Sequence, residues 1–510
     1  MCPEFAMIHR GNERKDGVNM TLKQEALMAR RRTEIRNPDC TRIIAKFFLP
    51  GDEHRVRGII QRVLALSEDE VQAMLDQVMK EFSHRHRRFR HILEKHFHAV
   101  TSLVPVPDTL SEARKLLLGA YFTNEYSVQC AGLFNPSIVP HPDQSGMKAD
   151  SLRFIMSFRS IGEGHISSLE FRSGILDEDS EIIHESISPF LEMPDVVFPQ
   201  DVDRSLLIAR LSEEGLSQSV QEQLQKKLPK RCRKDELVQL AKSLSLPEEE
   251  KNGLSEKLVK VADWFLQNNY EIRFDPETQL SERVIYPISP NECKGLEDAR
   301  FVYFQEDDDS VTYYATYTGY NGYTIQPKLL ETKDFVTFKV TTMAGPAVTN
   351  KTMALFPRRI GGKYAMLSRQ DGESMHIMFS DNLYVWQESE VIRTPSSPWE
   401  LIQIGTGSPP IETEEGWLVV NHGVGPMRKY CIGVELLDLE DPRRVIRHLE
   451  EPILSPNEKE REGYVPNVVY TCGALIHGGE LIIPYAMSDW ASGIASIPVK
   501  PLLDQLVEPR

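Results

Sequence analysis

The hexapeptide GLEDAR, residues 295–300, places two carboxylates side by side, Glu297 and Asp298, shortly before Arg300. A carboxylic acid held in a site can protonate the oxygen of a leaving group, so the motif indicates a general acid. The alternative is a turn carboxylate that pairs with Arg300. Because neighbouring residues on a strand point to opposite faces, we expect only one of the two carboxylates to face a site.

Polar residues also end several other strand-like segments. Five segments each form an apolar strand with a polar tip: LRFIMSFRS from residue 152, VTYYATYTG from 311, KYAMLSRQ from 363, GWLVVNHG from 416 and ELIIPYAMSD from 480. The tips and the runs beside them carry Asn135, Arg159, Asp298, Arg300, Lys351, Arg369, His422 and Asp489. Several cations with a few carboxylates suit an anionic co-substrate together with a sugar or polyol.

The five segments also predict the architecture that would bring these tips together. The last four segments begin roughly 50 to 65 residues apart, near the period of propeller blades, and each has shorter strand-like runs on both sides. Five such modules predict an all-β five-bladed β-propeller, whose inner strands end at a central channel. A sandwich with irregular loops is the alternative.

Two helical segments accompany the strand-rich part. Residues 1–122 are polar, with apolar residues at three- and four-residue spacing, and predict an N-terminal helical extension. Residues 123–510 form the predicted propeller, with a helical insertion at about 203–270 that is rich in Leu, Gln, Glu and Lys. The basic cluster from His84 to His91 suggests either a solvated helix face or oligomer contact, or a phosphate or nucleic-acid site, and the acidic chain favours the former.

Composition excludes several classes of protein. The 510 residues carry a net charge of −16, which argues against a general nucleic-acid binder. We expect no membrane span and no secretory signal, because no long apolar run exists. Seven scattered cysteines without a CxxC pair predict a cytoplasmic protein without disulfides or a zinc knuckle. The histidines show no metal-ligand spacing in the strand-rich part, so no metal is expected.

Six sequence blocks occur in a fixed order between residues 134 and 489. They are FNPSIV, GLEDAR, NKTMALFPRRIGGKYAMLSR, IGTGSPPIETEEGWLVVNHGV, GYVPNVVYTCGAL and IIPYAMSD. Together they resemble glycoside hydrolase family 130, the mannoside phosphorylases and β-mannosidases. The resemblance implies a five-bladed propeller that cleaves a β-mannoside oligosaccharide, β-1,2- or β-1,4-linked, with inversion. Inorganic phosphate would be the nucleophile and α-mannose 1-phosphate the product, with no cofactor.

The resemblance also implies roles for individual residues. Asp298 of GLEDAR would be the catalytic acid, its proton passing through a sugar hydroxyl, so we expect Glu297→Gln to be the milder change. Phosphate-binding roles fall on Lys351, Arg369 and His422. Substrate-binding roles fall on Asn135, Arg159, Arg300, Gln403, Glu460, Tyr485 and Asp489. Gln403 stands where family phosphorylases often carry a lysine, so Lys351, His422 and Arg369 would supply the positive charge.

Two other functions stay open at this stage. An inverting β-mannosidase needs a second carboxylate, roughly 6.5 to 9.5 Å from the acid, to activate water. A phosphorylase needs cations instead, and the strand tips offer more cations than spare carboxylates, which favours phosphorolysis. A non-catalytic glycan-binding propeller is the third possibility. The expected partners are the mannoside and phosphate, with no nucleic acid or membrane, and the N-terminal helices suggest a homo-oligomer.

Overall fold

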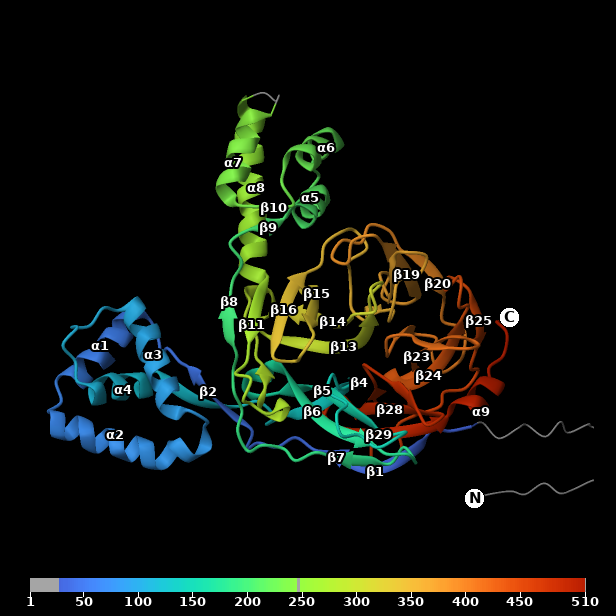
Figure 1. The fold of residues 1–510 in the computed structure, drawn as a ribbon, viewed down its shortest axis with the longest axis horizontal. Coiled ribbons are helices and arrows are strands. Elements are labelled where there is room, and N and C mark those ends of the chain that lie inside the picture. The colour runs from blue at the N-terminus through green and yellow to red at the C-terminus, as the bar shows by residue number, and fades with distance from the viewer. Residues whose placement is uncertain (1–26, 245–247, 510) are drawn as a thin grey trace, which may run out of the picture.

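The structure is a computed structural model that describes residues 27–244 and 248–509. Figure 1 shows a strand-rich body with a helical unit on one side and a group of helices projecting from its top. The strand-rich character predicted for residues 123–510 is confirmed, because antiparallel strands occupy most of this part of the chain.

The strands follow one another as groups of antiparallel neighbours. The first group comprises β4 (Gly132–Pro140), β5 (Leu152–Ile161), β6 (Ser167–Leu176) and β7 (Ile182–His184), with β12 (Val284–Ile285) beside β6. The second comprises β13 (Gly295–Gln305), β14 (Val311–Tyr320), β15 (Ile325–Thr332), β16 (Thr337–Thr342), β11 (Tyr270–Arg273) and β8 (Asp195–Val197). A single parallel pairing, Gly295 with Ser167, joins these two groups.

The remaining groups complete the body. The third comprises β17 (Ala354–Leu355), β18 (Tyr364–Ser368), β19 (Met375–Ser380) and β20 (Glu390–Arg393). The fourth comprises β21 (Gln403–Thr406), β22 (Ile411–Thr413), β23 (Gly416–Gly425), β24 (Lys429–Leu437) and β25 (Val445–His448). The fifth comprises β26 (Val469–Tyr470), β27 (Leu475–His477), β28 (Glu480–Met487), β29 (Ala491–Pro498) and β1 (Arg30–Arg36).

The first and fifth groups lie against each other, so the chain of groups closes. Leu133 of β4 donates its backbone N–H to the carbonyl of Trp490 at 2.9 Å, and the Ser492 hydroxyl donates to the Leu133 carbonyl at 2.9 Å. Figure 1 shows the groups succeeding one another from teal through yellow and orange to red. Strand ends from every group can therefore meet near one centre.

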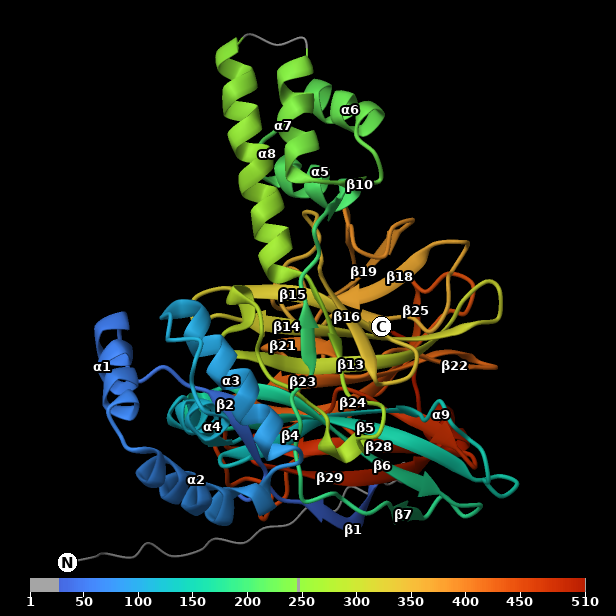
Figure 2. The same ribbon diagram turned by 60° about the vertical axis from the view of Figure 1, so that its left-hand side comes forward.

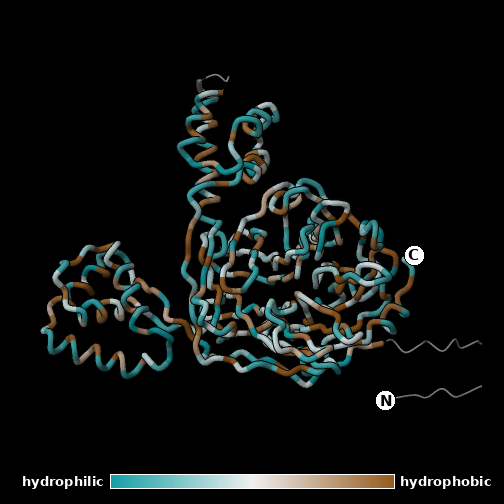
Figure 3. Tube along the Cα trace, in the orientation of Figure 1, coloured by the Kyte–Doolittle hydropathy of each residue, from teal (hydrophilic) through white to brown (hydrophobic). Residues whose placement is uncertain are grey.

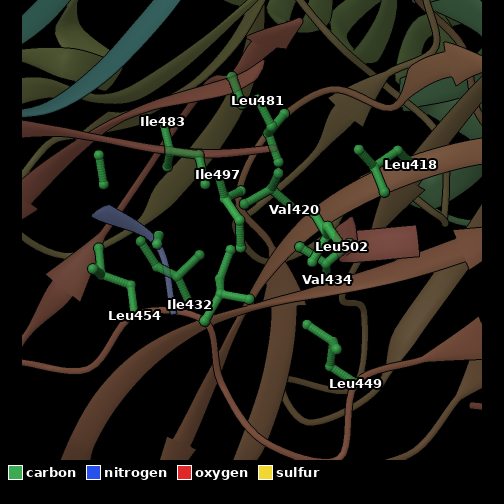
Figure 4. Packing of buried hydrophobic residues seen from close by; sticks show 14 of the residues in the cluster. Leu418, Val420, Ile432, Val434, Leu449, Leu454, Leu481, Ile483, Ile497 and Leu502 are labelled. Atoms are coloured by element: carbon green, nitrogen blue, oxygen red, sulfur yellow. The ribbon is translucent and has the colours of Figure 1, made fainter. Parts of the chain in front are cut away.

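Apolar side chains between neighbouring groups form the core. Figure 4 shows one such cluster, in which Leu418 and Val420 of β23 and Val434 of β24 pack near Leu481 and Ile497 of the fifth group. Leu502 of α9 (Val499–Asp504) covers the same cluster. These side chains are almost fully buried. Burying each contributes roughly 1.5–3 kcal/mol, so the packing between groups holds the strand ends in place.

The N-terminal part is only partly helical, which corrects the predicted helical extension over residues 1–122. Residues 1–26 lie outside the described residues. Strand β1 pairs with β29, and β2 (Ile43–Phe47) pairs with β3 (Thr123–Ser127). Between them lie α1 (Glu53–Leu64), α2 (Glu68–Phe82), α3 (Phe89–Leu103) and α4 (Glu112–Tyr121). The segment RRRTEIR, which forms β1, lacks the alternation of apolar and polar residues that predicts a strand. It is a strand because its backbone pairs with the open edge of β29.

The basic cluster at residues 84–91 forms ion pairs within the chain, which neither sequence interpretation anticipated. Arg85 and His86 contact Glu125, at 3.0 and 2.9 Å. Arg87 pairs with Glu282 at 2.7 Å, and Arg88 pairs with Asp275 and Glu192. The cluster thus attaches the helical unit to carboxylates of the strand-rich body.

The described residues of the predicted insertion, 203–244 and 248–270, include the helices α5 (Arg204–Glu213), α6 (Gln218–Lys227), α7 (Lys234–Ser243) and α8 (Glu248–Asn268). The short strands β9 (Val202–Asp203) and β10 (Arg231–Cys232) pair at their base. Figure 2 shows the helices projecting beyond the strands, and Figure 3 shows polar and apolar residues alternating along them. They enclose their own apolar cluster, which includes Leu211, Leu237 and Phe265. Over residues 27–244 and 248–509, no helix has both the length and the apolar character that crossing a membrane requires.

Candidate active site

A pocket of about 200 Å³ lies where the ends of strands from all five groups meet. Most residues predicted for the site line it: Asn135, Arg159, Asp298, Lys351, Arg369, Gln403, His422 and Asp489. They are separated by up to several hundred residues in the sequence. They converge because the strand groups close on one another, as the five repeated strand segments predict.

Asp298 lies on a β-bulge. The register of β13 against β14 shifts between Glu297 and Arg300, and Asp298 has a φ of 56°. Its carboxylate accepts a hydrogen bond from Asn135 Nδ2 at 2.6 Å and from Arg159 Nη1 at 3.3 Å. Arg300 instead donates to the backbone carbonyl of Asp298, at 3.0 Å. The alternative of a turn carboxylate ion-paired with Arg300 is therefore wrong.

The bulge also places Glu297 beside Asp298. Glu297 Oε1 accepts from Arg159 Nη2 at 2.8 Å, and its Oε2 accepts from Lys351 Nζ at 2.6 Å. Both carboxylates thus contact the same guanidinium, so the two side chains do not point to opposite faces here. The alternation of faces holds for regular pleated strands, and an extra residue in a bulge breaks it. Of the two, Asp298 lines the pocket and Glu297 does not, as the sequence predicts.

Electrostatics determine the ionisation of the two aspartates in the pocket. Burial alone would raise the pKa of Asp298, but the charges of Arg159, Arg300 and Lys351 hold it below its ordinary value. Burial raises the pKa of Asp489 to about 6, opposed by Arg159 and reinforced by the Asp298 charge. Asp298 is therefore ionised, and Asp489 is the carboxyl more easily protonated.

Two guanidinium groups, Arg369 in the pocket wall and Arg300 behind it, form no ion pair with a carboxylate among the described residues. Arg300 donates to the carbonyls of Thr406 and Gly407 at 3.3 and 3.1 Å, and to the Tyr470 hydroxyl at 2.6 Å. Arg369 is 8% exposed, and among the described residues its guanidinium has only a 3.5 Å contact with His422. Burial lowers the pKa of Arg369. Since buried charges are normally paired, this arrangement suits an anion.

His422 does not contribute a positive charge to the pocket, contrary to the sequence interpretation. It is 1% exposed, and burial together with Arg369 and Arg300 holds its pKa well below the ordinary value. The imidazole is therefore neutral and can exchange hydrogen bonds only. A Cβ at Gly405 would lie 2.6 Å from its ring, so glycine is required where β21 passes.

The pocket concentrates unpaired polar atoms and strained backbone. Buried side-chain atoms of Asn135, Arg159, Thr352, Arg369 and His422 have no hydrogen-bond partner within the described residues. Non-glycine residues with positive φ also gather here: Asn135, Asp298, Asn350, Thr352, Arg428, Ser488 and Asp489. Both features are typical of functional sites, where a ligand completes the hydrogen bonds and the fold holds the strain.

Three of the predicted residues do not line this pocket. Arg300 lies behind Asp298 and positions the loop at Thr406. Glu460 and Tyr485 lie elsewhere, since Glu460 accepts hydrogen bonds from Arg31 at 2.7 and 2.8 Å and from Tyr485 at 2.7 Å. They anchor β1 to the fifth group, which corrects their assignment to substrate binding. Nearness to a motif in sequence does not tell which side of a strand a residue occupies.

Sequence reasoning missed other residues that line the pocket: Thr352, Arg428, Tyr430, Val465, Val468 and Tyr470. Tyr430 stands near the start of β24, opposite Val424 at the end of β23. Tyr470 belongs to GYVPNVVYTCGAL, one of the six blocks, so its position in that motif was an available signal. Arg428 follows Met427 in a turn in which both residues have positive φ. No sequence pattern predicts this turn, so the position of Arg428 could not be inferred.

The fold and the site define a strand-built protein with a buried, positively charged pocket that contains two aspartates. A model of glycoside hydrolase family 130, described as beta-1,4-mannooligosaccharide phosphorylase, matches residues 266–508. A 1,2-beta-oligomannan phosphorylase of Thermoanaerobacter sp. (strain X514) is 36% identical over 231 residues, which are 44% of this chain and 74% of that protein. The chain belongs to glycoside hydrolase family 130, as the six sequence blocks predict.

Two further comparisons involve one bacterium. A beta-1,2-mannobiose phosphorylase of Listeria innocua is 30% identical over 234 residues, which are 44% of this chain and 63% of that protein. The solved structure of beta-1,2-mannobiose phosphorylase from Listeria innocua in complex with beta-1,2-mannobiose aligns with a TM-score of 0.44 and 22% identity. That alignment covers 75% of this chain and 93% of the other.

Proposed function

We propose that this protein is an inverting β-mannoside phosphorylase whose catalytic unit is a five-bladed β-propeller. The five consecutive antiparallel groups support the blade count, with β1 as an added strand of the last blade. Family membership supports the reaction, and the named relatives are phosphorylases of β-1,2- and β-1,4-linked mannosides. The cytoplasmic location and a homo-oligomer formed through the N-terminal helices stay predictions.

The observation that carries the proposal is the buried Arg369, which has no carboxylate partner within the described part of the chain. Phosphate would bind between Arg369 and Lys351, with neutral His422 as a hydrogen-bond partner and Arg300 behind it. Each charge-assisted hydrogen bond contributes on the order of 1.5–3 kcal/mol. An anion here neutralises a cation that has no carboxylate partner among residues 27–244 and 248–509.

The reaction follows from this placement. A phosphate oxygen attacks the anomeric carbon from the face opposite the glycosidic oxygen, and the bond to that oxygen breaks. The proton of Asp298 goes to the leaving oxygen, giving α-mannose 1-phosphate and a shortened saccharide. Asn135, Arg159 and Asp489 would hold the mannosyl unit, and Gln403 stands at the edge of the pocket.

Phosphate binding also explains how an aspartate with a lowered pKa acts as an acid. The positive charges around Asp298 favour its ionised form. A phosphate bound among the same cations adds negative charge, which raises the pKa of Asp298. The acid would therefore take up its proton when the nucleophile is present.

Incubation with β-1,2- or β-1,4-mannobiose, with and without inorganic phosphate, tests the proposal. α-Mannose 1-phosphate that forms only with phosphate is the expected result. Free mannose in both reactions would instead indicate an inverting hydrolase, for which Asp489 is the second carboxyl in the pocket. Binding of mannobiose without any product would indicate a glycan-binding propeller.

Substitution of the cations tests the nucleophile site. Arg369→Ala and Lys351→Ala are each expected to raise the KM for phosphate at least tenfold. The matched control is Arg358→Ala, because Arg358 is partly exposed and pairs with Glu412 at 2.6 Å away from the pocket. Wild-type phosphate dependence in both pocket variants would place the nucleophile elsewhere.

A further inference from the structure

Two aromatic rings, one from the first strand group and one from the fifth, stack on each other near the pocket. His165 ends the short turn Glu163–His165 between β5 and β6, in the first group. Tyr464 lies in the segment before β26, in the fifth group. Their ring centroids are 5.0 Å apart, with 28° between the planes. Tyr464 is 66% exposed and His165 is also exposed, so the pair presents ring surface to solvent.

The pair stands at the rim of the pocket. Val465, the next residue after Tyr464, lines the pocket, and so does Arg159 on the strand that leads to His165. Ile161, at the end of that strand, packs in the same apolar cluster as Val465. The two rings therefore continue the wall of the pocket outward.

The backbone holds both rings in place. Tyr126 donates its hydroxyl hydrogen to the carbonyl of Glu163 at 2.8 Å, and His165 keeps a φ of 55°. Next to Tyr464, a Cβ at Gly463 would lie 2.3 Å from the carbonyl oxygen of Ser488, so the two segments approach very closely. The backbone of Val465 also donates to that carbonyl, at 3.1 Å. The left-handed backbone of His165 is strained, and such strain is typical of binding sites.

The size of the pocket leaves part of a saccharide outside it. Its volume of about 200 Å³ is below the roughly 300–1,000 Å³ of pockets that enclose small-molecule ligands. A disaccharide together with phosphate must therefore extend over the rim. Aromatic faces pack against the apolar C–H face of a sugar ring, while the Tyr hydroxyl and the His nitrogens can bind its hydroxyls.

We propose that His165 and Tyr464 form a platform that binds the leaving saccharide of the β-mannoside, the sugar that accepts mannose in the reverse reaction. The inference rests on the proposed phosphorylase function and adds a binding site for the second sugar. Because the rings come from two different groups, the platform exists only when the first and fifth groups are closed on each other. It would determine which acceptor the enzyme uses, while the buried pocket determines the donor.

The reverse reaction separates the two sites. With α-mannose 1-phosphate as donor and mannose as acceptor, Tyr464→Ala and His165→Ala are each expected to raise the acceptor KM about tenfold. The KM for α-mannose 1-phosphate should stay within twofold of the wild-type value. Tyr464→Phe, which keeps the ring, is expected to recover most of the loss. Tyr303→Ala is the matched control, because Tyr303 is 40% exposed, contacts the Tyr313 ring and does not line the pocket.

Each outcome has one meaning. No mannosyl transfer by the wild-type enzyme, in either direction, would overturn the phosphorylase proposal itself. An active wild type with an unchanged acceptor KM in both alanine variants would overturn the platform alone. An equal rise in the KM for α-mannose 1-phosphate would also overturn it, since the change would then have disturbed the whole pocket.

Discussion

Glu297→Gln is the substitution for which the structure reverses the expectation from sequence. Glu297 would face away from the site on a regular strand, and the change would be mild. Instead its carboxylate bridges Arg159 and Lys351, at 2.8 and 2.6 Å, and the side chain is only 10% exposed. Glutamine keeps the shape and one acceptor oxygen but removes the charge that both cations share.

The contacts set the size of the effect. A hydrogen bond between charged groups contributes about 1.5–3 kcal/mol, but the Lys351 side chain is 38% exposed, so its pair contributes less. The contact with Arg159 should dominate, and its loss corresponds to roughly a 10- to 150-fold effect on rate. Because Arg159 also donates to Asp298, we expect the loss mainly in kcat rather than in the KM for the mannoside.

Steady-state phosphorolysis at saturating phosphate measures this effect. Glu297→Asp is the comparator, since it keeps the charge but withdraws the carboxylate by one methylene, and a thermal melt of each variant tests the fold. A kcat for Glu297→Gln within twofold of wild type, with an unchanged melting temperature, would refute the assignment of Glu297 as a positioning residue. It would mean that Arg159 and Lys351 keep their places without it.

Three other outcomes follow from particular residues. Asp298→Asn should retain the fold and lower kcat by at least about 100-fold, as expected for loss of a general acid, and near-normal turnover would exclude that role. Leu418→Ala, in the core cluster, should lower the free energy of unfolding by about 2–5 kcal/mol in denaturant titrations, whereas exposed Leu401→Ala should change it little. Burial raises the pKa of Glu435 to about 7. Between about pH 4.5 and 7 the folded state keeps this proton while the unfolded chain has lost it, so stability should fall as the pH rises across that range, and Glu435→Gln should flatten the slope.

The sequence by itself determined the family, the strand-rich body and most of the pocket. Strand segments with polar tips recur along the chain, and closure of such groups brings their ends together whatever their separation in sequence. For that reason Asn135 and Asp489, near the two ends of the strand-rich part, could both be predicted for one site. The helical insertion could also be predicted, because the segment 203–270 is rich in helix-forming residues.

Only the tertiary structure decided the orientation and charge of individual groups. The bulge at Asp298 turns Glu297 onto Arg159, which no alternation rule predicts because the shift arises from pairing with β14. Burial beside two guanidinium groups makes His422 neutral, and that environment comes from distant segments. Likewise β1 becomes a strand because β29 offers it an edge, and Glu460 then binds Arg31 rather than the pocket. Sequence patterns report local periodicity, whereas pairing, burial and ionisation depend on which distant segments become neighbours.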